Sequence, residues 1–214
     1  GFVRIRYEQQ GDKVVSVTLT NVPSLLAATG LTVKSSVLGT LSFDVAYGGN
    51  FYAIVDPQEH FKGLEHFTAG ELIRLSQELR PQINEKYPGR FVHPEDPNIR
   101  DVSHMLWTGA PLSGASTARN AVFYGEKAID RSPCGTGTSA RMAQWASRGR
   151  LHEGEVFIHE SYIGSVFEGR LAGQTHVGSF EAIIPEIKGS AWVHGYNTII
   201  IDDDHPFPQG FEVI

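Results

Sequence analysis

Stretches in which apolar and polar residues alternate recur along this chain and constrain its fold more than any other feature. The first, FVRIRYEQQGDKVVSVTLTNV at residues 2–22, alternates on both sides of QQGDK. A second candidate pair of strands, TLSFDVAYGGNFYAIVD at residues 40–56, turns at Gly48-Gly49-Asn50. Alternation with a period of two is typical of strands with one buried face, and Gly and Asn favour the tight turns between them. The first stretch is therefore predicted to form a hairpin with one face in the core.

Two segments are predicted to be helices instead. In TAGELIRLSQEL, from residue 68, Thr68 and Glu71 fit a capping box, and the apolar positions recur at Leu72, Leu75, Leu79 and Ile83. Pro81 is predicted to end or kink this helix. The second helix, TSARMAQWASR, is predicted to stop at Gly149. Further strands are expected at VSHMLW, at NAVFYG, and from EVFIHESYIGSVFEGRL to YNTIIID. The pattern indicates an α+β fold with mostly strands and two main helices.

Composition excludes some classes of partner. The 214 residues carry a formal net charge of −6, which argues against a nucleic-acid partner because such a partner favours clustered Lys and Arg. No run approaches the roughly 18 apolar residues of a membrane span. One cysteine rules out an internal disulfide and favours a reducing compartment, so a cytoplasmic protein is expected. Gly1 opens inside an apparent strand, which indicates a fragment or a processed form.

That cysteine, Cys134, lies in DRSPCGTGTSA at residues 130–140. A lone cysteine is by default a small buried core residue. The stretch GTGTSA also fits the relaxed dinucleotide pattern G-x-G-x-x-A, but no buried strand precedes it, and this interpretation is rejected. The third interpretation is a catalytic thiol. Cys134 comes just before a predicted helix, where free N–H groups and the helix dipole stabilise a thiolate and can bind a small anion.

The stretch DRSPCGTGTSARMA resembles the second cysteine motif of the proline racemase and hydroxyproline 2-epimerase family. Other segments resemble the family in the expected order along the whole chain: NVPSLL, DVAYGGNFYAIVD, HPEDPNIRDVSHMLW, HESYIGSVFEGR and GYNTIIIDDDHPFPQGF. The first cysteine motif of the family, a Met-Cys-Gly-His-Gly-Thr stretch, is absent from the sequence. The resemblance therefore implies one lobe of a two-lobed enzyme without its N-terminal lobe.

The implied fold is similar to diaminopimelate epimerase, with mostly strands around a central helix in this lobe. Residues 1–205 would form the second lobe, which carries the second catalytic cysteine, and residues 206–214 a C-terminal tail that returns to the first lobe. The expected partners are a small imino acid and the N-terminal lobe of the same protein, and a homodimer is left open. Because inversion requires a base on each face of the substrate, this fragment alone should not epimerise anything.

The family implies an amino-acid isomerase that needs no cofactor and no metal. One thiolate removes the α-proton while the opposite thiol protonates the other face. Carried over by motif, Cys134 is one of the two bases. Gly135 and Thr136 would offer backbone N–H groups to the substrate carboxylate, and Asp130 would hold the ring nitrogen.

The substrate is expected to be 4-hydroxyproline. The family's dehydratase branch typically has Thr where this chain has Cys134, which favours an isomerase. Proline racemases tend to carry Cys and Phe where His104 and Tyr124 align, and a polar pair at these positions suits a ring hydroxyl. A proline racemase is the first alternative. A catalytically incomplete homologue that binds imino acids or anions is the second.

Overall fold

The computed structural model describes residues 3–202, 204–208 and 210. The helices are η1 (Leu64–His66), α1 (Ala69–Lys86) and α2 (Gly135–Ser147). The strands are β1 (Arg4–Gln10), β2 (Lys13–Thr20), β3 (Ser24–Ser35), β4 (Gly39–Tyr47), β5 (Phe51–Val55), β6 (Val92–His93), β7 (Asp96–Arg100), β8 (Val102–Gly109), β9 (Ala118–Tyr124), β10 (Ala128–Ile129), β11 (Val156–Glu160), β12 (Val166–Val177) and β13 (Phe180–Gly189). The predicted α+β class is confirmed.

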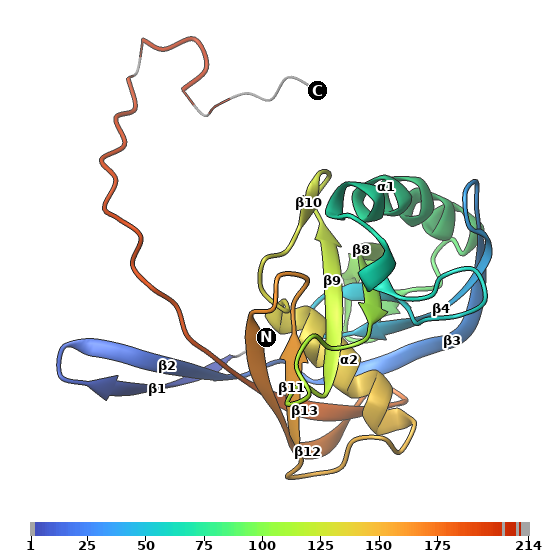
Figure 1. The fold of residues 1–214 in the computed structure, drawn as a ribbon, viewed down its shortest axis with the longest axis horizontal. Helices are drawn as coiled ribbons and strands as arrows, with labels where there is room; N and C mark the ends of the chain where they lie inside the picture. The colour runs from blue at the N-terminus through green and yellow to red at the C-terminus, as the bar shows by residue number, and fades with distance from the viewer. Residues whose placement is uncertain (1–2, 203, 209, 211–214) are drawn as a thin grey trace.

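Eight of these strands close into a barrel, in the order β13-β12-β11-β9-β8-β5-β4-β3, with β3 pairing back onto β13 (Figure 1). Most neighbours are antiparallel, but β5 pairs β8 and β11 pairs β9 in parallel. The predicted turn at Gly48-Gly49-Asn50 joins β4 to β5, and the segments VSHMLW and NAVFYG form β8 and β9. These sequence-based strand predictions are confirmed.

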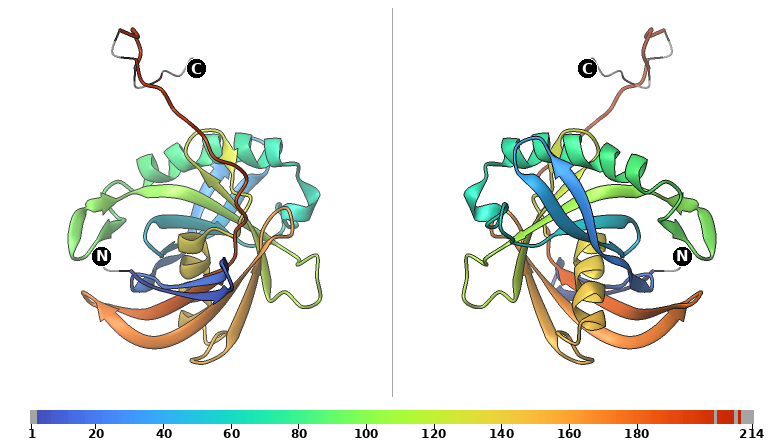
Figure 2. Two further views of the ribbon diagram at one scale, coloured as in Figure 1. Left: turned by 90° about the vertical axis from the view of Figure 1, so that its left-hand side faces the viewer. Right: turned by 90° about the vertical axis from the view of Figure 1, so that its right-hand side faces the viewer.

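Helix α2 is enclosed by the barrel strands, as Figure 2 shows, and contacts β3, β4, β5, β12 and β13. Every residue from Gly137 to Trp145 is buried, so the middle of the helix leaves no face to solvent. A helix buried on all sides cannot show the one-sided apolar stripe of a surface helix. The expectation of strands around a central helix is confirmed.

Helix α1 packs on the outside of the barrel (Figure 1). Its capping box is present, with the Thr68 hydroxyl accepting from the Glu71 N–H and Glu71 accepting from the Thr68 N–H. Trp107 of β8 donates to the Ser76 hydroxyl at 2.8 Å beneath the helix. Pro81, predicted to end or kink this helix, does not end it, because α1 continues to Lys86. Packing of the fully buried Ile83, beyond the proline, offsets the one backbone hydrogen bond that proline removes.

The β1–β2 hairpin departs from expectation. It forms as predicted, but it projects away from the barrel (Figure 1), and no residue of β1 is buried. Ile5 and Tyr7, on the face expected to be covered, are 63% and 64% exposed. The prediction of a buried face is therefore wrong for this chain, since none of its described segments lies over that face.

The chain leaves the barrel after Gly189, and all described residues beyond it are exposed and outside helices and strands (Figure 1). The strand predicted at residues 196–202 is absent because this segment has no neighbouring strand with which to pair. The predicted tail at 206–214 lies partly outside the described residues, which omit 209 and 211–214. None of the described helices is long and apolar enough to cross a bilayer.

Candidate active site

The backbone around Cys134 is held by a short series of hydrogen bonds. Asp130 Oδ1 accepts from the N–H and the hydroxyl of Ser132 at 2.8 and 3.0 Å, and the Ser132 hydroxyl accepts from the Cys134 N–H at 3.0 Å. From behind, the Asn120 amide donates to the Pro133 carbonyl at 2.9 Å. Cys134 itself has a φ of 64°, a conformation that is uncommon for residues other than glycine. These bonds hold the cysteine in that conformation.

Cys134 is the N-cap residue of α2, as the sequence predicts. Its Sγ accepts from the Gly137 N–H at 3.4 Å. Within the described part of the chain, the N–H groups of Gly135 and Thr136 have no hydrogen-bond acceptor. These are first-turn donors at the positive end of the helix dipole, which is the arrangement that binds a carboxylate. Cys134 is half-buried: it packs against a small core cluster on one side and, unlike a fully buried core residue, is partly accessible.

Sequence reasoning missed one residue of this site, Tyr52 of β5. Its hydroxyl lies 3.4 Å from the Cys134 Sγ and 2.5 Å from the Thr136 hydroxyl. Burial and the neighbouring Cys134 raise the pKa of Tyr52 well above its usual value. The only local feature that singles out Tyr52 is its position two residues after the Gly48-Gly49-Asn50 turn. Strand periodicity predicts which face of the sheet a side chain is on, but not which distant loop it contacts.

The β4–β5 turn itself contacts the start of α2. A Cβ at Gly48 would lie 2.2 Å from the Thr136 carbonyl oxygen and 2.5 Å from the Ala140 nitrogen, so only glycine fits there. The Asn21 side-chain amide donates to the Gly48 carbonyl and to the Ser139 hydroxyl, both at 2.9 Å. The turn and the first turn of the helix are thus fixed against each other.

His104 lies beside this group. Its ring stacks on Tyr52 with centroids 4.8 Å apart and a tilt of 32°, and its Nδ1 is 2.7 Å from the Ser103 hydroxyl. Burial and the positive charge of Arg80 lower the pKa of His104 to about 4, although Asp130 offsets this in part. The imidazole is therefore neutral near pH 7, so one of its nitrogens donates a hydrogen bond and the other accepts one.

Tyr124, the last residue of β9, is 45% exposed. Met105 of β8 pairs with Phe123 of β9, so the residues flanking this pair, His104 and Tyr124, lie on one face of the sheet. That face includes Leu106 and Val122, which pack toward Cys134. The structure therefore brings His104 into the site and leaves Tyr124 at its rim.

A buried histidine, His159 of β11, supports the loop from below. Its Nδ1 is 2.9 Å from the Thr138 hydroxyl, which also donates to the Pro133 carbonyl at 3.4 Å. Complete burial and the charge of Arg141 lower the pKa of His159 to about 3. This histidine is a neutral structural support for the helix start, and no local spacing in the sequence connects it with Cys134.

A hollow of about 330 Å³ opens at the start of α2, lined by Ser132 and Gly135 on one side. Its other walls are the segment 189–191, where the chain leaves β13, and four apolar side chains on one face of the sheet: Val17, Leu19, Phe167 and Ile187. Cross-strand pairing places Ile5 beside Leu19 and Tyr7 beside Val17, so the same face continues along the hairpin. We call Ile5, Tyr7, Val17, Leu19, Phe167 and Ile187 the apolar sheet face. It leads from solvent to the cysteine loop.

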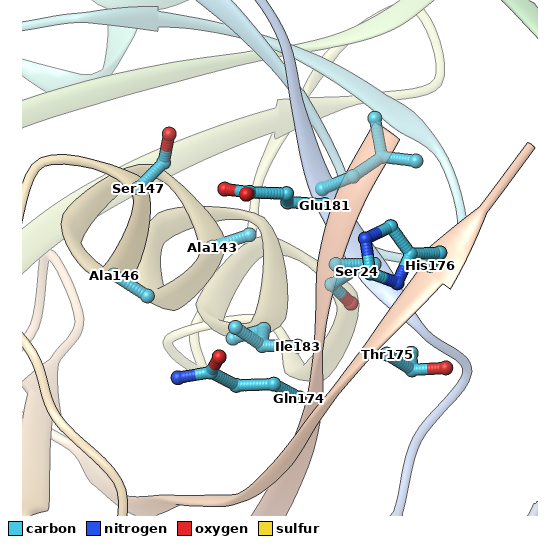
Figure 3. A pocket seen from close by; sticks show the side chains of 11 residues that line it. Ser24, Ala143, Ala146, Ser147, Gln174, Thr175, His176, Glu181 and Ile183 are labelled. Atoms are coloured by element: carbon cyan, nitrogen blue, oxygen red, sulfur yellow. The ribbon is translucent and has the colours of Figure 1, made fainter. Parts of the chain in front are cut away.

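A second hollow, of about 250 Å³, lies along a different part of α2, between that helix and β12, β13 and β3 (Figure 3). Ala143, Ala146 and Ser147 line it from the helix, with His176 and Glu181 on the strands. It does not include the cysteine loop. In the described part of the chain, no three His, Cys, Asp or Glu side chains are arranged to hold a metal ion.

Comparison with known proteins gives a consistent result. The proline racemase family matches residues 1–212. The chain is 58% identical over its whole length to the 4-hydroxyproline 2-epimerase of Spirosoma linguale and to that of Ancylobacter novellus, and it covers 64% of each. The crystal structure of a hydroxyproline epimerase from Agrobacterium vitis, with bound trans-4-hydroxy-L-proline, superimposes with a TM-score of 0.87 at 32% identity, covering 99% of this chain and 60% of that one. This chain thus spans under two thirds of the length of such relatives.

Proposed function

The chain belongs to the proline racemase family, and from this premise we propose that the protein containing it is a 4-hydroxyproline 2-epimerase. In this proposal two thiols act as acid and base on opposite faces of the α-carbon, and Cys134 is one of them. No cofactor takes part. The single observation that carries the proposal is the position of Cys134 at the start of α2, half-buried and next to two backbone N–H groups that have no acceptor among the described residues.

The charges around Cys134 support this chemistry. The substrate carboxylate would bind at the N–H groups of Gly135 and Thr136, which places the α-carbon near Sγ. Asp130 would hold the cationic ring nitrogen with Oδ2, since Oδ1 is used by Ser132. A cationic nitrogen acidifies the adjacent C–H bond, and fixed dipoles stabilise the negative charge that develops as the proton leaves. Proton transfer by a positioned side chain typically contributes 10²–10⁴-fold to a rate.

The second thiol would come from a second lobe, as in a diaminopimelate-epimerase-like enzyme. The relatives are longer than this chain, which covers 64% of their length. The apolar sheet face supports this, because it exposes Ile5 and Tyr7 and ends at the hollow beside Gly135. The opposite face of the hairpin carries ion pairs instead, Arg6–Glu186 at 2.8 Å and Lys188–Glu8 at 2.9 Å. A lobe packed on the apolar sheet face would cover the cysteine loop.

The preference for 4-hydroxyproline rests on the polar groups near the thiol. The neutral ring of His104, stacked on Tyr52, offers a hydrogen bond to the ring hydroxyl, and Tyr124 offers a second from the rim. A site built to hydrogen-bond a hydroxyl discriminates against substrates that lack it. The bound ligand of the Agrobacterium vitis relative has such a hydroxyl.

The test is incubation of the full-length protein with trans-4-hydroxy-L-proline in D₂O, followed by NMR at the α-proton. We expect inversion with incorporation of solvent deuterium, and a loss of at least about 10²-fold in Cys134→Ser. The 214-residue chain alone should show no turnover, because it carries one cysteine. Binding of the imino acid without α-proton exchange would contradict the proposal and favour a binding protein. Unchanged turnover in Cys134→Ser would also contradict it.

A further inference from the structure

We propose that the Tyr52 hydroxyl, together with the Thr136 hydroxyl, hydrogen-bonds the Cys134 sulfur and stabilises its thiolate, which makes Tyr52 a positioning residue for this base. The inference rests on the proposed function, since it assigns Cys134 to proton transfer. Tyr52 comes from β5, 82 residues before the cysteine. It contacts the proposed base rather than the substrate.

The geometry brings three polar atoms together. Tyr52 Oη lies 3.4 Å from Cys134 Sγ, Thr136 Oγ1 lies 3.6 Å from the same sulfur, and the two hydroxyl oxygens are 2.5 Å apart. All three separations are within hydrogen-bond range, which is longer for sulfur. The Gly137 N–H is a third donor beside the two hydroxyls, 3.4 Å from Sγ. The sulfur thus faces hydroxyl groups on one side and the first turn of α2 on the other.

The two hydroxyls can form hydrogen bonds with the sulfur in both of its protonation states. Each hydroxyl carries one proton and can also accept, whereas a thiolate can only accept. With the thiolate present, one hydroxyl donates to the other, and the second donates to Sγ, so that each bond strengthens the next. With the thiol present, the S–H can donate and the hydroxyls can turn to accept. Epimerisation in both directions requires a base that alternates between thiol and thiolate. Here the sulfur has hydrogen-bond partners in both states.

The surroundings of Tyr52 keep its hydroxyl protonated, so that it remains a hydrogen-bond donor. Its side chain is fully buried and its ring is stacked on His104. Because burial and the neighbouring Cys134 raise its pKa well above the usual value, the phenol keeps its proton across the neutral range. Two other ionisable groups lie nearby: His104 on β8, whose ring packs on that of Tyr52, and Asp130 in the loop, which accepts from Ser132. The first turn of α2 contains no acidic residue.

Substitution of Tyr52 by Phe keeps the ring and the stack on His104 but removes the hydroxyl. The measurement is alkylation of Cys134 by iodoacetamide in the full-length protein over a range of pH, followed by mass spectrometry of the peptide that contains it. We expect the midpoint of the pH profile to rise by about one to two pH units in Tyr52→Phe. Thr136→Val should raise it as well, and the double variant should raise it further.

Tyr47→Phe is the matched control. Tyr47 is also buried and lies on the adjoining strand, but its ring contacts Phe51 and His93 instead of the cysteine loop. In Tyr47→Phe we expect the midpoint of the alkylation pH profile to equal that of the wild type. A variant that merely loosened the barrel would expose Cys134 and increase alkylation at every pH without moving the midpoint.

The outcomes separate this inference from the proposed function. An upward shift in Tyr52→Phe with an unchanged Tyr47→Phe supports the inference, whether or not the protein epimerises 4-hydroxyproline. An unshifted midpoint in Tyr52→Phe overturns it, even if the wild-type protein epimerises and Cys134→Ser does not. In an active protein, the lower limb of the kcat pH profile should shift in the same direction as the alkylation midpoint.

Discussion

At the scale of single residues, the backbone of Cys134 determines where its sulfur points. A φ of 64° at a non-glycine residue costs on the order of 1–3 kcal/mol and persists only where the surroundings impose it. Here the Ser132 hydroxyl accepts from the cysteine N–H, and Asp130 in turn fixes Ser132. The same carboxylate is proposed to hold the substrate nitrogen. In this proposal one aspartate both shapes the loop and binds the ligand.

The substitution His104→Ala tests the proposed role of this residue in hydroxyl recognition. Loss of a hydrogen bond in a closed site leaves a buried polar group unpaired, at about 1–3 kcal/mol. In the full-length protein we expect kcat/KM for 4-hydroxyproline to fall by about ten- to a hundredfold. Turnover of proline, which has no ring hydroxyl, should fall much less. The measurement is a paired kinetic comparison of both substrates.

His104→Phe is the matched variant, because it keeps an aromatic ring against Tyr52 and removes only the ring nitrogens. It should show the same selective loss for 4-hydroxyproline as His104→Ala. Equal losses on both substrates would mean that His104 supports Tyr52 and the loop rather than the ring hydroxyl. A wild-type protein that prefers proline would identify a proline racemase.

At the scale of elements, the site depends on the close approach of the β4–β5 turn to the first turn of α2. Gly48 packs against backbone atoms of Thr136 and Ala140, which cannot move without shifting the helix. Asn21 ties the same two elements together through hydrogen bonds to Gly48 and Ser139. Because Tyr52 lies two residues after this turn, the approach also sets the distance between its hydroxyl and the sulfur.

Gly48→Ala should therefore both destabilise the chain and disturb the site. The added Cβ would lie 2.2 Å from a backbone oxygen, and overpacking of this kind costs about 1–3 kcal/mol. We expect urea unfolding to show a loss of that size, together with a changed rate of Cys134 alkylation. Gly114→Ala, at an exposed position with no atom within 4 Å of the new Cβ, is the control. Equal stability of the two variants would refute the close approach.

At the scale of the whole molecule, buried histidines link stability to pH. The pKa of His159 is lowered from 6.5 to about 3 in the folded chain by its complete burial and by Arg141. In the unfolded chain His159 binds a proton below pH 6.5, whereas in the folded chain it does so only below about pH 3. Stability from this residue is thus complete above pH 6.5 and declines as the pH falls toward 3. His104, with a pKa of about 4, adds a smaller loss in the same direction.

We expect the free energy of unfolding of His159→Gln to depend less on pH than that of the wild type. Between pH 7 and pH 5 a single fully buried histidine of this kind accounts for a loss of about 2 kcal/mol, which the neutral amide removes. Urea unfolding at both pH values gives the difference, and it is independent of any constant offset caused by the substitution. His152→Gln, the same change at an exposed position, should keep the wild-type slope. Parallel slopes for His159→Gln and wild type would contradict the assignment.

Local patterns in the sequence determined the elements. Period-two alternation predicted the hairpins and the turn at Gly48-Gly49-Asn50, and the Thr68–Glu71 pair predicted the start of α1. The Gly and Thr residues after Cys134 predicted a helix beginning there. Each of these signals depends on residues close together in the chain, where the backbone conformation and the first hydrogen bonds are set. The resemblance of longer motifs predicted the family, which the comparisons show.

Only the tertiary structure decided which distant residues meet. The proximity of Tyr52 to Cys134, of His159 to Thr138, and of Gly48 to α2 arises from barrel closure, which no local spacing encodes. Alternation predicted that one face of the β1–β2 hairpin would be apolar, but whether that face is covered depends on what packs over it. A strand pattern likewise becomes a strand only where a neighbour supplies the hydrogen bonds, and residues 196–202 have no such neighbour here. Sequence determines the local conformational preference, and burial against distant partners decides the outcome.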